Sequence, residues 1–550
     1  MGNGVRQVIG NAAKIFGLCV IMATVLPAKA QSNTGETRAA DGPGGDEVVP
    51  APLATKDIIP LVQQYCGACH DVPAPSLLPK GSWPYVIDSM VELARNRTGQ
   101  AFIPAEVVPH IKALYYGSSP EALPRLPYID QPHPVVSFEE FAMDAGSSVP
   151  QILNIQSVDL GRGAERSFLV SDGERSELIL MEAHRKAGTL QWRETVVAEI
   201  AIPIVARVVD FNGNGRLDIL VADLGEFPPS GVLEGKVFVL EQDEKGQFEK
   251  RLLMHQLGRV SDIQALDVDG DGDLDMAVAV FGGVGVGEVF WVENLGGGDY
   301  EKHDLLGLSG ALNVTPVDLD GNGRMDFVSL VAQEHETLIA FINEGEGRFR
   351  RKDLVRAGHP LFGATSLVVA DLNQNGRPDL VFTNGDAFDT QSEPKPYHGV
   401  QWLENKGDLQ FEAHDIGRFY GAAQVAVGDM DLDGDLDLVV TSWLNHWDDE
   451  KRQSMVWFEN DGKQNFQPHP VSHGHRALVP IELVDLTGDG RLDIVTGAFR
   501  MDILKEFMSM DGNNPVLDME AMRTDDRAPS PRLLMFENRV SETGAAGTEN

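Results

Sequence analysis

The nine-residue stretch DVDGDGDLD, residues 267–275, decides the fold, because close copies of it recur along the chain. Five further copies start at residues 210, 318, 371, 429 and 485, and successive starts lie 51 to 58 residues apart. A degenerate copy starts at Asp159, where Gly161 and Gly163 replace residues with side-chain oxygens. Such regular self-similarity predicts a repeat architecture.

A second marker occurs once per repeat and usually ends in Glu-Asn. It reads WVEN at residues 291–294 and WFEN at residues 457–460. Its other copies lie at residues 180–182, 239–241, 341–343, 402–405 and 535–538. Both markers therefore indicate seven units.

The repeats have the length and pattern of propeller blades. Each loop is followed by a short β-rich run, such as residues 276–280, and the second marker lies on another strand. Units of about 56 residues with four short strands are typical of a β-propeller, whose blades bury their faces against one another. We predict a mainly β fold: a seven-bladed propeller over residues 150–538 and a flexible tail at residues 539–550. The alternative is a β-solenoid, whose repeats are usually much shorter.

The repeated loops have the composition of calcium sites. Carboxylate or amide oxygens stand mostly at positions 1, 3 and 5, an acid closes the loop at position 9, and glycine occupies position 6. With a backbone carbonyl from position 7, these oxygens suit Ca²⁺. An EF-hand opens in the same way but closes with Glu at position 12 between helices. The alternative, a hairpin turn without metal, does not readily explain six parallel loops.

The sequence thus predicts up to six bound Ca²⁺ ions, held at positions 1, 3, 5, 7 and 9. The candidate ligands are Asp210, Asn212, Asn214, Arg216, Asp218, Asp267, Asp269, Asp271, Asp273, Asp275, Asp318, Asp320, Asn322, Arg324, Asp326, Asp371, Asn373, Asn375, Arg377, Asp379, Asp429, Asp431, Asp433, Asp435, Asp437, Asp485, Thr487, Asp489, Arg491 and Asp493.

These repeats resemble the FG-GAP/VCBS propeller family, which includes integrin α-chain heads and many secreted bacterial proteins. The resemblance covers about 390 residues and rests on the six loops. It implies a calcium-binding propeller. The Phe-Gly…Gly-Ala-Pro element itself survives only in fragments such as residues 362–364, which weakens an adhesive interpretation.

A different motif, CGACH, occupies residues 66–70. Its spacing is that of a c-type haem attachment site, in which Cys66 and Cys69 form thioether bonds and His70 is the proximal iron ligand. The alternative is a redox or structural disulfide. No βαβ pattern of a thioredoxin follows the motif, which argues against that alternative.

Helical patterns accompany the motif at residues 58–65, 83–95 and 105–116. A covalently held haem would complete the core of so short a unit. Residues 53–130 resemble a small class I cytochrome c domain. The resemblance implies a methionine as sixth ligand, for which Met90 is the candidate.

Alternatives to this ligand set remain open from the sequence. Met90 shares a helical face with Val86 and Leu93 and could be a core residue, and His110 and Met143 are the other candidate ligands. The resemblance also implies a proline that orients the proximal histidine, and the candidates are Pro73, Pro75 and Pro79.

Residues 1–30 have the pattern of a secretory signal peptide. Basic Arg6 and Lys14 precede an apolar run at residues 15–26 and a small-x-small cleavage site ending at Ala30. The run is too short to cross a hydrocarbon core of about 30 Å. We expect cleavage after Ala30, a disordered linker at residues 31–52, and a secreted, periplasmic or extracellular protein without a transmembrane anchor.

The charge balance restricts the partners. The chain has 83 acidic and 45 basic residues and a formal charge of −38. Nucleic-acid binding is excluded, because it requires a basic surface to neutralise phosphates. An anionic surface instead favours a redox partner with a basic docking patch.

Long insertions are expected between the second and third strands of the blades, on the face opposite the loops. They lie at residues 223–235, 384–399, 443–452 and 499–530. Insertions on one face of a repeat protein usually form its binding surface. A carbohydrate or small-molecule site is one interpretation of the side chains expected there: Trp443, His446, Trp447, Tyr397, His398, Asp386, Asp448 and Asp449. The last insertion carries Met501, Met508, Met510, Met519 and Met522, which suit adaptable packing or Cu(I) binding.

Two functions are compatible with this organisation. The first is a secreted c-type cytochrome, in which the haem carries one electron and the propeller is a docking or ligand-binding module. The second is a periplasmic oxidoreductase, in which the propeller face oxidises a small molecule or carbohydrate and passes electrons to the haem. No nucleotide-binding glycine loop, nucleophile elbow or metalloprotease helix is visible in the sequence. We therefore assign no catalytic residue and prefer the electron carrier.

Overall fold

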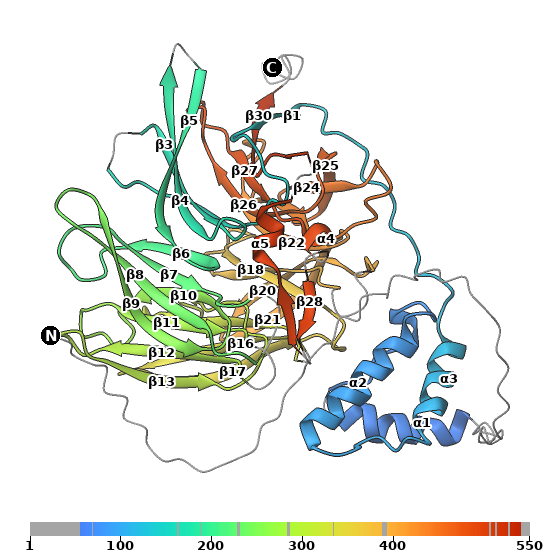
Figure 1. Cartoon of the computed structure of the whole chain (residues 1–550). Coiled ribbons are helices and arrows are strands. Elements are labelled where there is room, and N and C mark those ends of the chain that lie inside the picture. The colour runs from blue at the N-terminus through green and yellow to red at the C-terminus, as the bar shows by residue number, and fades with distance from the viewer. Residues whose placement is uncertain are drawn as a thin grey trace, which may run out of the picture.

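The computed structural model describes residues 55–540, apart from residues 69, 162–163, 187–188, 228–230, 283–285, 334, 388–392, 505, 507, 512–513 and 526–527. The predicted signal peptide, the predicted linker and residues 541–550 of the predicted tail lie outside the described residues. The described chain forms a small helical unit beside a ring of β-sheets (Figure 1).

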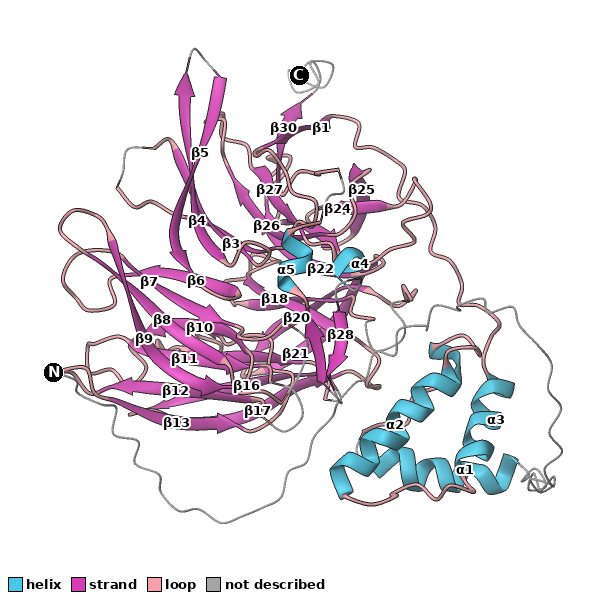
Figure 2. Ribbon diagram, viewed as in Figure 1, coloured by secondary structure: helices cyan, strands magenta, loops and turns pink. Residues whose placement is uncertain are grey.

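Seven four-stranded sheets form this ring in the described part of the chain, and they confirm the mainly β, seven-bladed propeller (Figure 2). Each of the first six blades uses four consecutive strands. Blade one contains β2 (Ile152–Ser157), β3 (Arg166–Asp172), β4 (Glu177–Lys186) and β5 (Thr189–Glu199). Blade two contains β6 (Pro203–Val209), β7 (Asp218–Asp223), β8 (Gly235–Gln242) and β9 (Phe248–Leu257). Blade three contains β10 (Val260–Leu266), β11 (Asp275–Val280), β12 (Glu288–Asn294) and β13 (Tyr300–Leu306). Blade four contains β14 (Thr315–Val317), β15 (Asp326–Val331), β16 (Thr337–Gly345) and β17 (Arg348–Arg356). Blade five contains β18 (Ala364–Ala370), β19 (Asp379–Asn384), β20 (Gly399–Gly407) and β21 (Gln410–Arg418). Blade six contains β22 (Ala422–Gly428), β23 (Asp437–Ser442), β24 (Gln453–Asn460) and β25 (Phe466–His473).

Blade seven closes the ring with strands from both ends of the propeller. Its order is β26 (Leu478–Val484), β27 (Asp493–Ala498), β30 (Leu533–Val540) and β1 (Val136–Ala142). β1 pairs antiparallel with β30, from Val136 opposite Val540 to Ala142 opposite Leu534. β1 lies upstream of residue 150 and carries neither repeat marker, so the repeats alone do not reveal it.

The blades are stabilised mainly by contact with their neighbours. In blades two to seven the second strand is buried along its whole length, as in β11 and β15. Val278 and Phe290 of blade three pack in one apolar cluster with Leu220 and Val239 of blade two. Fully burying a side chain of this kind stabilises the fold by about 1.5–3 kcal/mol relative to exposure.

The helical unit contains α1 (Thr55–Tyr65), α2 (Trp83–Thr98) and α3 (Val108–Ser118), with the short 3₁₀ turns η1 (Cys66–Ala68) and η2 (Pro75–Leu77). The third predicted helix, over residues 105–116, begins at Val108 instead, because residues 105–107 form a turn before it. Pro109 then stands in the first helical turn, where its missing N–H costs no hydrogen bond.

Two aromatic residues form the centre of this unit. The rings of Trp83 and Tyr115 lie 4.3 Å apart between centroids. The Trp83 indole donates to the carbonyl of Pro75, and the Tyr115 hydroxyl donates to the carbonyl of Pro73, both at 2.9 Å. The segment after the CGACH motif is therefore tied to two helices.

The helical unit contacts the propeller at blade five. Leu361, in the connection between β17 and β18, is only 8% exposed and belongs to the same apolar cluster as Ile58 and Trp83. Ser82, before α2, donates to a carboxylate oxygen of Glu393 at 3.5 Å. An apolar side chain of the propeller thus forms part of the helical core.

A segment that we call the strap, residues 126–131, leads from the helical unit towards β1 along blades five and six. Arg452 donates to the carbonyl of Leu126 at 3.0 Å. Its guanidinium lies 4.6 Å from the ring centroid of Tyr128 and 5.2 Å from that of Tyr420. The strap is therefore held by a buried cation between two aromatic rings.

The last insertion contains α4 (Met501–Leu504), β28 (Met508–Asp511), β29 (Asn514–Leu517) and α5 (Met519–Arg523). Met522 is 1% exposed and packs with Val149 and Ile503, while Met501 and Met519 cover this small cluster. Packing against the propeller therefore accounts for these three methionines. None of the described helices is long and apolar enough to cross a membrane.

Candidate functional site

The predicted haem motif follows α1. Cys66 begins η1 and packs, half-buried, against the apolar core of the helical unit. Burial raises the pKa of its thiol to about 11. His70 is also half-buried, and its Nδ1 lies 2.9 Å from the carbonyl oxygen of Asp71. Cys69 lies outside the described residues.

This environment fits a covalently bound porphyrin. An apolar core around a cysteine suits the hydrophobic macrocycle, and an Nδ1–H bond to a backbone carbonyl leaves Nε2 of a histidine free to bind a metal. The His70 tautomer that donates to Asp71 has this arrangement. Cys66 and His70 could therefore hold the haem together with Cys69.

The candidate sixth ligands occupy three environments. Met90 lies half-buried on α2, outside the apolar cluster that includes Val86. His110 is on α3 and only 9% exposed. Met143 is 5% exposed and packs with Ile152 and Phe168 in the propeller. Met143 is therefore a propeller core residue, and the structure contradicts it as an alternative haem ligand.

Two of the candidate prolines are held in place by helix side chains. The carbonyl of Pro73 accepts from Tyr115, and that of Pro75 accepts from Trp83 and also from Ser119 at 2.8 Å. Both prolines follow His70 closely in sequence, so the fold restricts the backbone on that side of the histidine.

The predicted calcium loops connect the first and second strands of blades two to seven. Side-chain oxygens of Asp267, Asp269 and Asp271 lie within 4.8 Å of one another, as do those of Asp318, Asp320 and Asp326. The structure therefore gathers positions 1, 3 and 5 in one loop and positions 1, 3 and 9 in another.

Backbone geometry explains the glycine at position 6. Gly272 has a φ of +99° and Gly434 a φ of +96°, values that side-chain-bearing residues rarely adopt. The N–H of Gly272 donates to Asp267 Oδ2 at 3.2 Å, and that of Gly434 donates to Asp429 Oδ2 at 3.0 Å. Position 1 thus shapes the loop through position 6.

The closing acid at position 9 is buried and held at both oxygens. Asp326 Oδ1 accepts from the N–H of Asn343 at 2.7 Å, and Oδ2 accepts from that of Leu319 at 3.0 Å. Burial raises the pKa of Asp326 to about 6 and that of Asp437 to about 7. Each carboxylate oxygen retains a second lone pair. These acids can therefore accept the backbone hydrogen bonds and coordinate a cation at the same time.

Several other loop oxygens are buried without a hydrogen-bond partner. They include Oδ1 of Asn373, Oδ1 of Asp429 and Oγ1 of Thr487. Buried polar atoms are normally paired, and an exception calls for a partner such as an ion. These oxygens stand at positions 1 and 3, so the donor set fits Ca²⁺.

The predicted position-7 residues divide into two kinds. In three loops the arginine donates from Nε to the carbonyl at the end of the blade's third strand: Arg216 to Gln242, Arg324 to Asn343 and Arg377 to Asn405. In the loops that begin at residues 267 and 429, position 7 is an aspartate. In these three loops the arginine side chain therefore fastens the loop to the blade, and only its backbone carbonyl remains a candidate for the metal. Arg491, in the loop that begins at residue 485, instead lies 3.8 Å from a carboxylate oxygen of Asp489.

The predicted insertion-face residues are largely engaged in holding the loops. The Tyr397 hydroxyl donates to the carbonyl of Leu361 at 2.9 Å, and the Trp443 indole donates to that of Gly385 at 3.1 Å. His398 is fully buried. Asp449 accepts from the strap residue Tyr128 at 2.8 Å. These four residues are thus structural rather than free ligand contacts.

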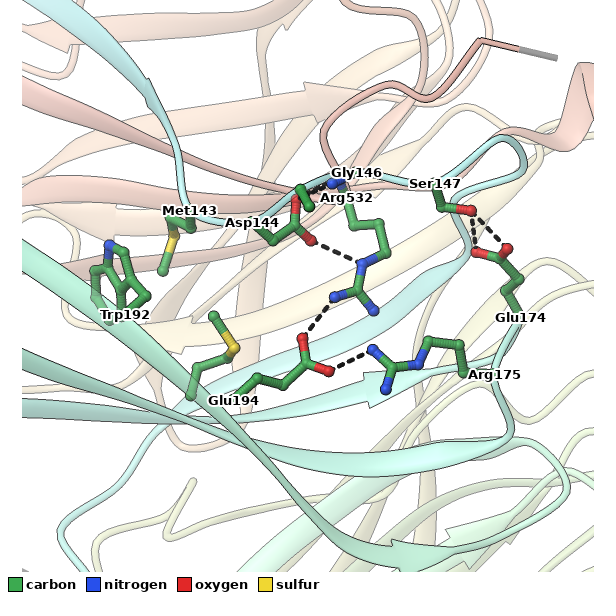
Figure 3. A pocket seen from close by; sticks show the side chains of 11 residues that line it. Met143, Asp144, Gly146, Ser147, Glu174, Arg175, Trp192, Glu194 and Arg532 are labelled. Atoms are coloured by element: carbon green, nitrogen blue, oxygen red, sulfur yellow. Dashed lines mark hydrogen bonds and ion pairs between the residues drawn. The ribbon is translucent and has the colours of Figure 1, made fainter. Parts of the chain in front are cut away.

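A cavity of 490 Å³ lies instead where blades one and seven meet, and the sequence markers do not indicate it. Figure 3 shows Trp192 and Met143 on one side of it, and a chain of ion pairs from Asp144 through Arg532 and Glu194 to Arg175. The lining comes from three stretches that lie far apart in sequence, at residues 143–147, 174–194 and 532, which explains why no local motif reveals it.

A second feature beyond the predictions is a histidine stacked on the marker tryptophan. His303 stacks on Trp291, His414 stacks on Trp402, and His469 lies tilted against Trp457. Each histidine Nε2 lies 2.6–3.0 Å from the marker glutamate, which is Glu293, Glu404 or Glu459. Each histidine also follows its tryptophan by 12 residues, and this spacing was the available sequence signal.

Comparisons with known proteins agree with the repeat pattern. A family model described as an FG-GAP-like repeat matches residues 210–278 and 267–329. Integrin alpha pat-2 of Caenorhabditis elegans is 27% identical over 234 residues, which cover 36% of this chain and 18% of that protein. The Caenorhabditis briggsae protein of the same name is 26% identical with the same coverage. This chain thus spans less than a fifth of the length of these curated relatives.

Among solved structures, an exotype rhamnogalacturonan lyase superposes with a TM-score of 0.35 and 13% identity, over 64% of this chain and 71% of that one. The repeat match and the sheet topology are independent observations. The chain therefore carries FG-GAP-like repeats, and its β-sheets form a seven-bladed β-propeller.

Proposed function

We propose that this protein is a secreted or periplasmic c-type cytochrome that transfers single electrons, with a calcium-stabilised propeller as its docking module. The single observation that carries the proposal is the CGACH motif at the end of a helix, with Cys66 against an apolar core and His70 oriented by a backbone carbonyl. A bound haem c supplies a one-electron iron couple.

Particular residues of the helical unit would attach the haem and position it. Cys66 and Cys69 would attach the porphyrin, and His70 and Met90 would be the side-chain ligands of its iron. Trp83 and Tyr115 fix the segment that follows the motif, which restricts the position of His70. The helical core limits the access of water, which tunes the potential of a haem iron.

The propeller would supply recognition. The six loops bind Ca²⁺ as structural clips, and the formal charge of −38 favours a redox partner with a basic patch. The similarity to part of two integrin alpha chains is consistent with a protein-binding propeller. Association that becomes slower as ionic strength rises would support this docking mode.

The experiment is an absorption spectrum of protein produced with periplasmic haem maturation, before and after dithionite. A sharp α-band in the reduced protein and a covalent haem mass on the chain are expected. Cys66→Ala should reduce covalent attachment. Met90→Ala should change the spectrum of the oxidised protein, whereas Met325→Ala, at an exposed methionine of the propeller, should not. A chain without an α-band would refute the cytochrome assignment.

The second candidate function is an oxidoreductase that passes electrons from a substrate to the haem. The cavity at the seam of blades one and seven favours it, because 490 Å³ can hold a small molecule. Haem reduction by a carbohydrate or alcohol would identify this activity. The same reduction in a Trp192→Ala variant would exclude the cavity as the place of reaction.

A further inference from the structure

Blades three and five carry the same three ionisable side chains on their outer hairpins. In blade three they are Glu293, Glu301 and His303, and one ligand atom from each lies within 4.8 Å of the others. The equivalent group in blade five is Glu404, Glu412 and His414, with the same spacing limit. The two glutamates of each group are direct partners across the hairpin. The blades therefore provide an internal comparison.

In blade five, the position between the carboxylates is taken by a cation of the chain itself. Nζ of Lys406 lies 2.9 Å from an oxygen of Glu404 and 3.1 Å from an oxygen of Glu412. The ammonium group neutralises the pair. This geometry shows that the hairpin can hold a positive charge between its two glutamates.

Blade three has the same carboxylates without that ammonium. Lys406 follows the marker dipeptide Glu404-Asn405, and the residue at the same place in blade three is Leu295, which is 54% exposed. Within the described residues, no lysine or arginine pairs with Glu293 or Glu301. Two adjacent carboxylates without a cation repel each other, so a bound cation would stabilise this hairpin.

The histidine of blade three is held in a fixed position. Its ring stacks on Trp291 with centroids 4.3 Å apart and an interplanar angle of 15°. Its Nε2 lies 2.8 Å from an oxygen of Glu293. Packing on one side and a carboxylate on the other fix the ring, which is the preorganisation that metal sites require.

The donor set decides the kind of cation. One imidazole nitrogen with two carboxylates suits zinc and similar divalent transition metals, whereas Ca²⁺ prefers oxygen ligands alone. We propose that Glu293, Glu301 and His303 bind one divalent transition metal ion, with Zn²⁺ as its representative. None of the three residues belongs to the loop at residues 267–275, and water can complete the coordination because Glu301 is exposed.

The first test is calorimetric titration of the full chain with Zn²⁺. The protein is saturated with Ca²⁺ so that the loops are occupied, and its free thiols are alkylated so that they do not bind zinc. Glu301→Gln and His303→Gln should each raise the Kd of one Zn²⁺ at least about tenfold. The matched variants Glu412→Gln and His414→Gln in blade five should leave that Kd unchanged. A Kd that is the same in all four variants would refute the site.

The second test exchanges the residue that distinguishes the two blades. Leu295→Lys should abolish the zinc site of blade three by placing an ammonium between its glutamates. Lys406→Leu should create a second zinc site in blade five. Both residues are partly or fully exposed, and thermal unfolding checks that the variants remain folded. Unchanged stoichiometry in both folded variants would overturn the proposal.

Discussion

Arg532 donates from Nη1 to Oδ2 of Asp172 at 2.6 Å, although the two residues are 360 positions apart. Asp172 is fully buried at the end of the second strand of blade one, and Arg532 immediately precedes β30 of blade seven. The same guanidinium donates to Asp144 at 2.7 Å and to Glu194 at 2.6 Å. One arginine therefore joins three carboxylates across the seam where the ring closes.

We expect Arg532→Ala to lower the free energy of unfolding by about 3–5 kcal/mol, because it leaves the buried Asp172 carboxylate without its cation. Chemical denaturation measures the loss. The control is Arg539→Ala, which removes a half-exposed arginine paired with Glu537 and Glu139. Such a surface pair contributes at most about 1 kcal/mol. Equal effects of both substitutions would contradict the role of the seam.

Removal of calcium should destabilise the propeller. A ligand present at ten times its Kd stabilises the folded state by about 1.4 kcal/mol per site, and a Kd of about 10⁻⁴ to 10⁻³ M is expected for an extracellular module. Excess EDTA should therefore lower the Tm, and added Ca²⁺ should restore it. The absence of any shift would show that the loops are turns without metal.

The strap should depend on Arg452. Arg452→Ala removes two bonds to strap carbonyls and two cation–π contacts, which together contribute about 2–3 kcal/mol. We expect faster proteolysis within residues 126–131, because the strap would no longer be held against blades five and six. Lys451→Ala, beside it, is the control, since Lys451 lies 5.4 Å from only one ring. Equal proteolysis of the two variants would contradict this prediction.

His359 should make stability dependent on pH. It packs against Phe362 and Tyr397 next to Leu361, and burial, with a smaller effect of Lys395, lowers its pKa from 6.5 to about 4. A lowered pKa gives stability that is complete above pH 6.5 and is lost as the pH falls towards 4. The loss between pH 7 and pH 5 is roughly 1–2 kcal/mol.

Denaturation of the wild type and His359→Phe at both pH values measures this effect. The variant cannot be protonated, so its stability should change less over the same interval. A parallel decrease in the two proteins would assign the pH dependence to other groups.

The blade count and the loop positions follow from the sequence because they are local and repeated. Each loop contains its own position-1 aspartate and its own position-6 glycine with positive φ. The same sequence motif therefore appears in every blade that has such a loop. The three helices around CGACH were also predictable, since each has its own apolar periodicity. The start of the third helix was not, because the turn before Val108 determines it.

The predicted insertion-face site shows the limit of this reasoning. Tyr397 and Trp443 lie on the predicted insertions, but their polar atoms bond to neighbouring loops. Met143 was another candidate haem ligand, yet it packs in the propeller core. Neither outcome can be derived from spacing, because spacing does not specify which surfaces meet.

The sequence by itself determined the seven repeats, the oxygen-rich loops and the CGACH motif, since each depends on residues within a few positions of one another. Only the tertiary structure decided how β1 closes the ring, and how Arg532 and Arg452 fasten the seam and the strap. These relationships join segments that approach only after the chain folds. The contacts that position a site across blades therefore have no local pattern from which to predict them.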